Sequence, residues 1–195
     1  PGVYDDAYKK ALELKEEHGY TFVHPFDDEN VIAGQGTIGL EILNEMDDLD
    51  AVIVPIGGGG LIAGIAFAIK SLRPNVKVYG VQAAGAPSMF RSIKDGQIGT
   101  LDSVSTIADG IAVKRPGDLT YEIVSKYVDD IATVTEDEIC AAILKLIEKQ
   151  KMIAEGAGAV SVAAAMFNKF PIQGKKVVCV ISGGYIDVTS LSHVI

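Results

Sequence analysis

The chain has 195 residues, of which 48% are hydrophobic and 22% charged, and this composition fits one globular domain or slightly more. Its formal net charge of −9 offers no long-range attraction to phosphate backbones, so nucleic acid is not an expected partner. Cys140 and Cys179 lie in apolar runs without a CxxC pair or a histidine cluster. They therefore predict neither a zinc site nor a disulfide framework, and they indicate a reducing, cytoplasmic compartment.

Helical and strand-like patterns alternate along the first half of the chain. The spacing of apolar residues, with charges between them, predicts a helix over 4–18 that Gly19 ends. The continuous apolar run 51–55 is typical of a strand buried on both faces. The other features of this half are a β-rich segment at 20–23, a helix over 29–46 loosened by Gly34 and Gly36, a helix over 61–72, a strand over 76–81 and a helix near 86–95.

The second half continues the alternation after an irregular stretch, 96–116. Asp118 is expected to cap a helix to about 127, and Thr135 with Glu138 forms a predicted capping box for a helix to about 150. The remaining expected elements are a strand over 131–134, a helix over 156–169, a strand over 175–182 and a helix that starts in 187–195. This order predicts an α/β fold, with a mainly parallel open sheet and helices on both faces.

Residues 51–69 carry no charge and are nearly long enough to span a bilayer. Gly60 and Gly64 even form a GxxxG pair within them. However, Pro55 and four consecutive glycines interrupt the run, so a strand, a loop and a helix fit it better. No membrane partner is expected.

Four consecutive glycines, Gly57, Gly58, Gly59 and Gly60, lie between the buried strand 51–55 and the following helix. We call them the tetraglycine loop. Glycines let several backbone N–H groups approach one anion, and the helix start adds partial positive charge. The loop contains no lysine, so the GK[ST] signature of a P-loop is absent. The pattern favours a phosphate held by neutral amides.

Two other interpretations of this loop stay open. Gly58, Gly60 and Ala63 satisfy the GxGxxA spacing of a dinucleotide fold, but Gln82 stands where that fold needs a carboxylate. Alternatively, the glycines only turn the chain, although a turn needs fewer of them, since each glycine loses much conformational entropy on folding.

A second glycine-containing loop, at Ser182, Gly183 and Gly184, also follows a predicted buried strand. A hydroxyl in this place could reach a heterocycle over the sheet edge. Glu155 opens a segment rich in glycine and alanine, where a carboxylate usually serves only the helix dipole. Neither feature is specific alone.

Seven motifs together resemble a known family. They are ProPheAspAsp (25–28), AlaGlyGlnGlyThrIle (33–38), GlyGlyGlyGlyLeuIle (57–62), AlaAspGlyIleAlaVal (108–113), ArgProGly (115–117), GluGlyAlaGlyAla (155–159) and SerGlyGlyTyrIleAsp (182–187). In this order they resemble the threonine/serine dehydratases and serine racemase, which share the fold of the tryptophan synthase β-subunit. The resemblance covers essentially all 195 residues.

The resemblance implies an incomplete pyridoxal-phosphate (PLP) enzyme of fold type II. It implies that the tetraglycine loop binds the cofactor phosphate, that Ser182 hydrogen-bonds the pyridine nitrogen and that Glu155 lies near the ring. The cofactor-binding residues implied in this way are Gly57, Gly58, Gly59, Gly60, Leu61, Glu155, Ser182 and Gly183. Residues 1–27 would be the remainder of a small domain, and residues 28–195 a large PLP-binding domain without its first strands.

The sequence departs from the family at three places. The family lysine that binds PLP covalently lies in a SerPheLysxArgGly motif that is not in this sequence, so we assign no catalytic residue to the chain. Lys70 and Lys145 lie on charged helix faces and are expected to be solvated. Tyr185 replaces the usual asparagine after SerGlyGly. Gln82 and Ser88 stand where serine racemase-like members have an acidic, metal-binding pair, so no metal is expected.

Two hypotheses of function follow. In the first, the parent protein is a cytoplasmic, homo-oligomeric PLP lyase that converts L-threonine, and L-serine as well, to 2-oxobutanoate or pyruvate plus ammonia. In the second, the chain is a non-catalytic folded module or fragment, inactive because it lacks the lysine. The preference between threonine and serine stays open.

Overall fold

The computed structural model describes residues 4–187 and residue 189, so most of the helix expected in 187–195 lies outside the described residues. The elements in chain order are α1 (Tyr4–His18), α2 (Glu29–Glu45), β1 (Ala51–Pro55), α3 (Gly60–Leu72), β2 (Lys77–Ala83), α4 (Ser88–Asp95), the 3₁₀ turn η1 (Asp109–Ile111), α5 (Asp118–Tyr127), β3 (Asp130–Val134), α6 (Glu136–Gln150), α7 (Gly156–Met166) and β4 (Val177–Cys179).

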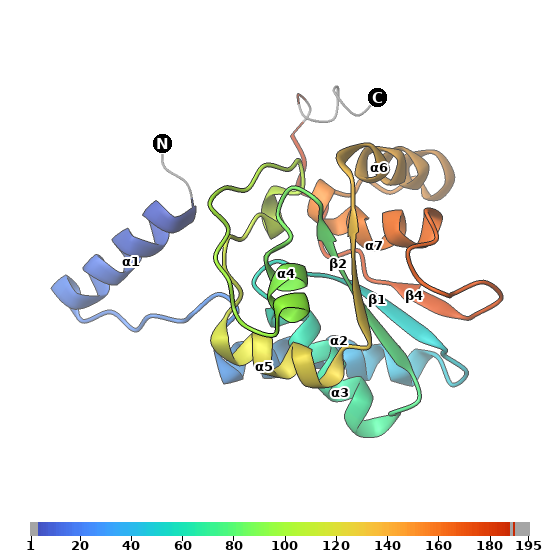
Figure 1. Cartoon of the computed structure of the whole chain (residues 1–195), viewed down its shortest axis with the longest axis horizontal. Coiled ribbons are helices and arrows are strands. Elements are labelled where there is room, and N and C mark those ends of the chain that lie inside the picture. The colour runs from blue at the N-terminus through green and yellow to red at the C-terminus, as the bar shows by residue number, and fades with distance from the viewer. Residues whose placement is uncertain (1–3, 188, 190–195) are drawn as a thin grey trace.

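The four strands form one parallel sheet in the order β3-β2-β1-β4 (Figure 1). All five residues of β1 are buried, as the continuous apolar run predicts for a central strand. Helices cover both faces of the sheet. The predicted α/β architecture is therefore confirmed.

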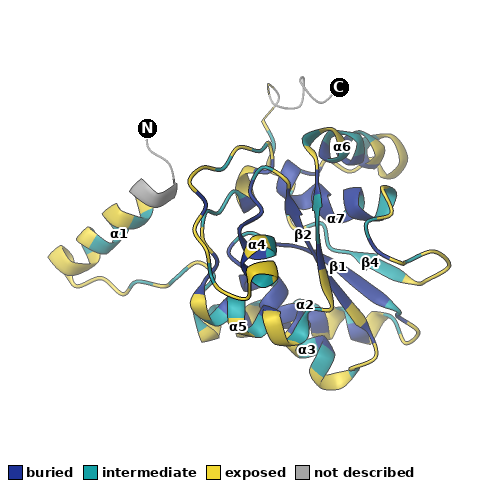
Figure 2. Cartoon of the chain, in the orientation of Figure 1, coloured by how far each residue is buried: buried dark blue, intermediate teal, exposed yellow. Residues whose placement is uncertain are grey.

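The two faces of the sheet carry separate cores because successive side chains of a strand point to opposite faces. Val52 and Val54 belong to a cluster with buried residues of α2, α3 and α5. Ile53 and Val81 belong to the other cluster, with buried residues of α6 and α7. In Figure 2 the two central strands are accordingly buried, whereas much of α1 is exposed.

Helix α2 runs without interruption through Gly34 and Gly36, so the loosening expected there does not occur. Close packing against α3 accounts for Gly36, where an added Cβ would lie 3.3 Å from the Gly64 carbonyl oxygen, but not for the exposed Gly34. A Cβ on Gly64 of α3 would come within 2.3 Å of the Ile32 carbonyl oxygen, so only glycine allows the two helices to approach this closely.

Helix starts are capped mostly as expected, with one correction. Thr135 and Glu138 form the predicted capping box of α6. Asp118 does not cap α5, because Gly117 occupies the cap position and Asp118 is the first helical residue. The carboxylate of Asp27, far away in sequence, takes the capping role by accepting from backbone N–H groups of the first turn.

Two further expectations need correction. Residues 20–23 pair with no described strand and form an extended link after α1. The strand expected over 175–182 shortens to three half-buried residues in β4, which pairs with β1 alone among the described strands. Hydrogen bonding to β1 continues one residue further, since the Val180 N–H donates to the Ile53 carbonyl at 3.0 Å.

Lys70 is not a solvated side chain, although its helix face is charged. Its side chain is 13% exposed, and its Nζ lies 2.6 Å from Oδ2 of Asp129. Lys145, by contrast, is half-exposed as expected.

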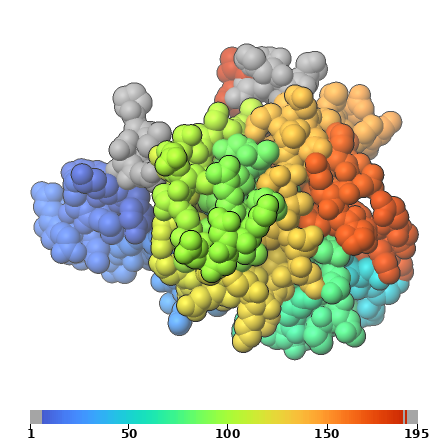
Figure 3. Space-filling model, viewed as in Figure 1, coloured from blue at the N-terminus to red at the C-terminus, as the bar shows by residue number. Residues whose placement is uncertain are grey.

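Helix α1 stands apart from the sheet and its helices (Figure 1). It contacts the link that follows it, with the Tyr8 ring edge-on to Phe22 at 5.5 Å between centroids. In the space-filling view, the green segment from about residue 85 to 115 covers the front of the molecule next to α1 (Figure 3).

No helix among the described residues is long and apolar enough to cross a membrane. The uncharged run 51–69 instead forms β1, the tetraglycine loop and most of α3.

Candidate functional site

The path of the chain creates a crevice at the carboxyl ends of β1 and β4. From β1 the chain moves to β2 and then β3, and it returns through α6 and α7 to place β4 on the opposite side of β1. The connections after β1 and before β4 thus lie on opposite faces of the sheet. In open α/β sheets, ligands bind at such a switch point, outside the carboxyl ends of the strands.

The tetraglycine loop follows β1 at this crevice. Gly57, Gly58 and Gly59 form a bend, and Gly60 is the first residue of α3. Gly59 has a φ of 105° and caps α3 without any side-chain hydrogen bond. Among the described residues, nothing accepts a hydrogen bond from the four backbone N–H groups of the loop. A helix start with free N–H groups favours an anion.

Both predicted loops line one cavity of about 430 Å³, a volume in the range of small-molecule sites. Ser182 contributes from the segment after β4, and Glu155 from the start of α7. Of the eight residues expected to bind the cofactor, seven line this cavity, namely Gly57, Gly58, Gly59, Gly60, Leu61, Glu155 and Ser182. Gly183 is not among its lining residues.

Glu155 ties α7 to the Ser182 loop. Its N–H donates to the Gly183 carbonyl at 3.2 Å, and its Oε2 accepts from the Tyr185 N–H at 3.1 Å. The carboxylate makes no capping bond within α7 and holds the Tyr185 N–H instead, so it does more than serve the helix dipole. The Tyr185 side chain is 98% exposed. The Tyr185 ring, which stands where the family has asparagine, therefore does not fill the space around Ser182.

Sequence reasoning missed several residues around the cavity. Pro25, Phe26 and the segment 109–113 line it, and Thr120 of α5 holds the tetraglycine loop from behind through a hydrogen bond to the Gly58 carbonyl. The sequence contains the motifs at 25–28 and 108–113, but nothing in them indicates contact with the tetraglycine loop. Thr120 lies in an ordinary amphipathic helix, and no motif around it indicates a role at the cavity.

Comparison with known proteins decides the family. Residues 1–183 match the model of a family described as "Pyridoxal-phosphate dependent enzyme". The chain belongs to this family. It is 55% identical over 193 residues to L-threonine ammonia-lyase of Thermotoga maritima, covering 99% of this chain and 48% of that protein.

Solved structures support the same family. The processed form of threonine deaminase isoform 2 from Solanum lycopersicum superposes with a TM-score of 0.93 at 40% identity, over 98% of this chain and 53% of that one. Maize serine racemase gives a TM-score of 0.91 at 34% identity, over 98% of this chain and 60% of that one. The expected resemblance and fold type are confirmed, and the chain spans about half the length of the curated relatives it matches.

The residues around the crevice fit the family's cofactor, PLP. The free N–H groups of the tetraglycine loop suit a phosphate, and the cavity also presents a hydroxyl on Ser182 and a carboxylate on Glu155. The dinucleotide interpretation needs a carboxylate at position 82 that faces the ligand, and the Gln82 side chain is committed elsewhere. This side chain is fully buried, donates to the Ile56 carbonyl at 3.3 Å and accepts from the Phe90 N–H at 2.8 Å.

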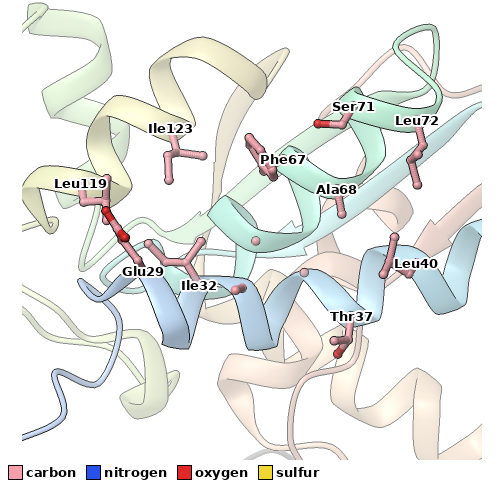
Figure 4. A pocket seen from close by; sticks show the side chains of 13 residues that line it. Glu29, Ile32, Thr37, Leu40, Phe67, Ala68, Ser71, Leu72, Leu119 and Ile123 are labelled. Carbon is pink, nitrogen blue, oxygen red and sulfur yellow. The ribbon is translucent and has the colours of Figure 1, made fainter.

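A larger cavity of about 650 Å³ lies elsewhere, between α2, α3 and α5 (Figure 4). Apolar side chains such as Ile32, Phe67, Leu72 and Ile123 dominate its lining, and Glu29 is the one ionisable residue among the described residues that line it. Because it presents no convergent polar groups, it lacks the means to orient PLP or an amino acid.

Proposed function

We propose that the protein containing this chain is a PLP-dependent L-threonine ammonia-lyase. It would convert L-threonine, and L-serine as well, to 2-oxobutanoate or pyruvate plus ammonia. The observation that carries the proposal is the cavity in which the tetraglycine loop meets Ser182 at the switch point of the sheet. The name of the Thermotoga maritima relative, 55% identical, supports the same reaction.

In this proposal the tetraglycine loop holds the cofactor phosphate through backbone N–H groups, with Leu61 in the first turn of α3 beside them. The partial positive charge at the start of α3 adds to the attraction. No cationic side chain lies among the described residues of the cavity lining, so neutral donors would do this work. An amide cradle keeps its geometry independent of pH.

Ser182 would donate a hydrogen bond to the pyridine nitrogen of the cofactor. PLP, when bound, supplies an electron sink for the electron pair that is left on Cα when one of its bonds breaks. A hydroxyl does not keep a proton on the ring nitrogen as a carboxylate would, so we expect moderate electron withdrawal and loss of the β-hydroxyl. Glu155 and Gly183 would fix the Ser182 loop through the hydrogen bonds between the two segments.

The chain itself would not complete the reaction. It lacks the SerPheLys motif that carries the family lysine, and in the family this amine binds PLP covalently. We propose that residues 1–27 belong to the small domain of the parent protein and residues 28–195 to its large domain. The separation of α1 from the sheet supports this division.

We further propose a cytoplasmic homo-oligomer. Both cysteines are free thiols, which suits a reducing compartment. Leu40, Phe67 and Leu72 are exposed by 43%, 50% and 62% around the apolar cavity, and such surface favours self-association. Light scattering after size exclusion tests this, and a monomer at micromolar concentration would contradict it.

The reaction is tested by joining the chain to the missing part of the Thermotoga maritima relative and following 2-oxobutanoate from L-threonine with PLP. We expect turnover on the order of 1–10³ per second, and none above background from the 195-residue chain alone. A chimera that binds PLP but leaves threonine intact would refute the proposed reaction. Turnover by the chain alone would mean that another residue replaces the lysine.

A further inference from the structure

We propose that Thr120 is a positioning residue for the cofactor phosphate, because it fixes the peptide between Gly58 and Gly59 in the orientation that turns the Gly59 N–H toward the cavity. The inference rests on the proposed PLP function and concerns a residue outside the cavity lining. Thr120 lies in the first turn of α5 and is fully buried.

Two donors converge on the Gly58 carbonyl oxygen. The Thr120 hydroxyl donates to it at 2.6 Å, and the Gly117 N–H donates at 3.2 Å. The hydroxyl has one proton, and its other contact, the Gly117 carbonyl at 3.3 Å, is much longer. The Gly58 carbonyl is therefore held firmly toward α5.

The planarity of the peptide carries this constraint to the next residue. In a trans peptide, the C=O and the following N–H point in opposite directions, and no cis peptide occurs among the described residues. With the Gly58 carbonyl toward α5, the Gly59 N–H points away from that helix. Of the described residues that line the cavity, none belongs to α5. Because Gly59 lines the cavity and no described residue accepts from its N–H, the proposal places this N–H on the cavity side of the loop.

A constraint of this kind is needed because the loop is made of glycines. Glycine occupies positive and negative φ with similar ease, so the peptide between two glycines can rotate to exchange the places of its C=O and N–H. The exchange would replace a donor by a carbonyl oxygen next to a phosphate. Thr120 opposes it, since the rotated carbonyl would lose both donors.

Asp27 holds Thr120 in turn. Its Oδ1 accepts from the Thr120 N–H at 3.1 Å, and its Oδ2 accepts from the Asp118 N–H at 3.0 Å. The carboxylate therefore anchors the start of α5, and α5 anchors the tetraglycine loop. This connection gives the ProPheAspAsp motif a task at the phosphate site, although Asp27 itself does not line the cavity.

The test uses the 195-residue chain with pyridoxine 5′-phosphate, which has no aldehyde and so cannot bind lysines covalently, and with inorganic phosphate. Thr120→Val keeps the shape and removes the hydroxyl, whereas Thr120→Ser keeps the hydroxyl. We expect Thr120→Val to weaken pyridoxine 5′-phosphate binding about tenfold in calorimetry, in line with the loss of one hydrogen bond near a charged group. Thr120→Ser should remain within about threefold of the wild type.

Ser92→Ala is the matched control for stability. Ser92 is also buried, and its hydroxyl donates to the Ser88 carbonyl at 2.8 Å, away from the tetraglycine loop. This variant should lose stability without losing affinity for the phosphate compound. Loss of affinity in Ser92→Ala equal to that in Thr120→Val would overturn the proposal, because it would indicate a general effect of destabilisation.

The Gly59 amide provides a second measurement that does not depend on the variants. In ¹H–¹⁵N spectra, its proton resonance should move on addition of either phosphate compound, and the movement should shrink in Thr120→Val. A wild-type chain that binds neither compound would overturn the assignment of a phosphate site to the tetraglycine loop, and this inference with it, whereas the proposed reaction is refuted by the chimera. Binding that is equally tight in Thr120→Val, or a Gly59 resonance that does not move, would overturn this inference alone.

Discussion

The substitution Gly59→Ala tests the geometry of the tetraglycine loop most directly. Gly59 has a φ of 105°, which residues with a Cβ rarely adopt, and strain of this kind costs about 1–3 kcal/mol. An added Cβ would also lie 2.8 Å from the Met89 methyl carbon and 2.8 Å from Cβ of Thr120. Overpacking of this kind adds about 1–3 kcal/mol.

We therefore expect Gly59→Ala to lower the free energy of unfolding by about 2–6 kcal/mol, a large share of the roughly 5–15 kcal/mol that is typical of domains. Urea denaturation followed by circular dichroism measures the change. Gly34→Ala is the matched control, because Gly34 lies in α2, is exposed and has no atom within 4 Å of the added Cβ. In this control the free energy of unfolding should rise by about 0.5–1 kcal/mol, because alanine favours a helix interior over glycine.

Binding provides the second readout of the same variant. The Cβ of Gly59→Ala would also come within 2.9 Å of the Thr120 hydroxyl oxygen, so the bond that orients the loop would be disturbed. We expect pyridoxine 5′-phosphate binding to fall below detection in Gly59→Ala and to be unchanged in Gly34→Ala. If Gly59→Ala is as stable as the wild type within about 0.5 kcal/mol, the loop does not have the described conformation, and the reasoning about its N–H groups fails with it.

Three other predictions concern single side chains. Tyr185→Asn should change pyridoxine 5′-phosphate affinity less than about twofold, because the Tyr185 side chain is 98% exposed; a tenfold gain in calorimetry would contradict this. Burial works to raise the pKa of Asp129, but hydrogen bonds from Lys70 and Lys77 outweigh it and hold this pKa below its ordinary value of 3.8. The stabilisation by these ion pairs is thus fully present above pH 3.8 and is lost as the pH falls through the lower pKa of the folded state. Asp129→Asn should therefore lower the free energy of unfolding by about 1–2 kcal/mol at pH 7. In urea titrations this difference should shrink below pH 4, and a constant difference would argue against the ion pairs. Burial raises the pKa of the Cys179 thiol to about 11, so thiol reagents at pH 8 should modify Cys179 much more slowly in the native than in the unfolded chain; equal rates would contradict the packing of β4.

Much of the fold could be predicted because its signals are local. The apolar run of β1, the helical spacing of α1 and the capping box of α6 each depend on residues that are neighbours in sequence. The tetraglycine loop and Ser182 could be expected in one crevice because parallel strands bring their carboxyl ends to the same edge of a sheet.

The parts that escaped prediction depend on contacts between distant segments. Asp27 caps a helix that begins 91 residues later in the chain, and local sequence favoured Asp118 for that role. Thr120 reaches a carbonyl 62 residues away. Lys70 lies on a charged helix face, yet Asp129 draws it into a nearly buried ion pair. Spacing rules contain no information on such partners.

The position of the cavity between β1 and β4 ties cofactor affinity to the folding equilibrium of the sheet. Its two sides belong to segments that meet only when β4 has paired with β1. A ligand that spans them binds the docked state and not a chain with β4 detached, so it adds RT ln(1 + [L]/Kd) to the free energy of docking. At a free concentration of 100 Kd this is about 2.7 kcal/mol. Backbone amides of the short edge strand should then exchange with solvent deuterium more slowly in step with cofactor concentration, while those of α1 keep their rate.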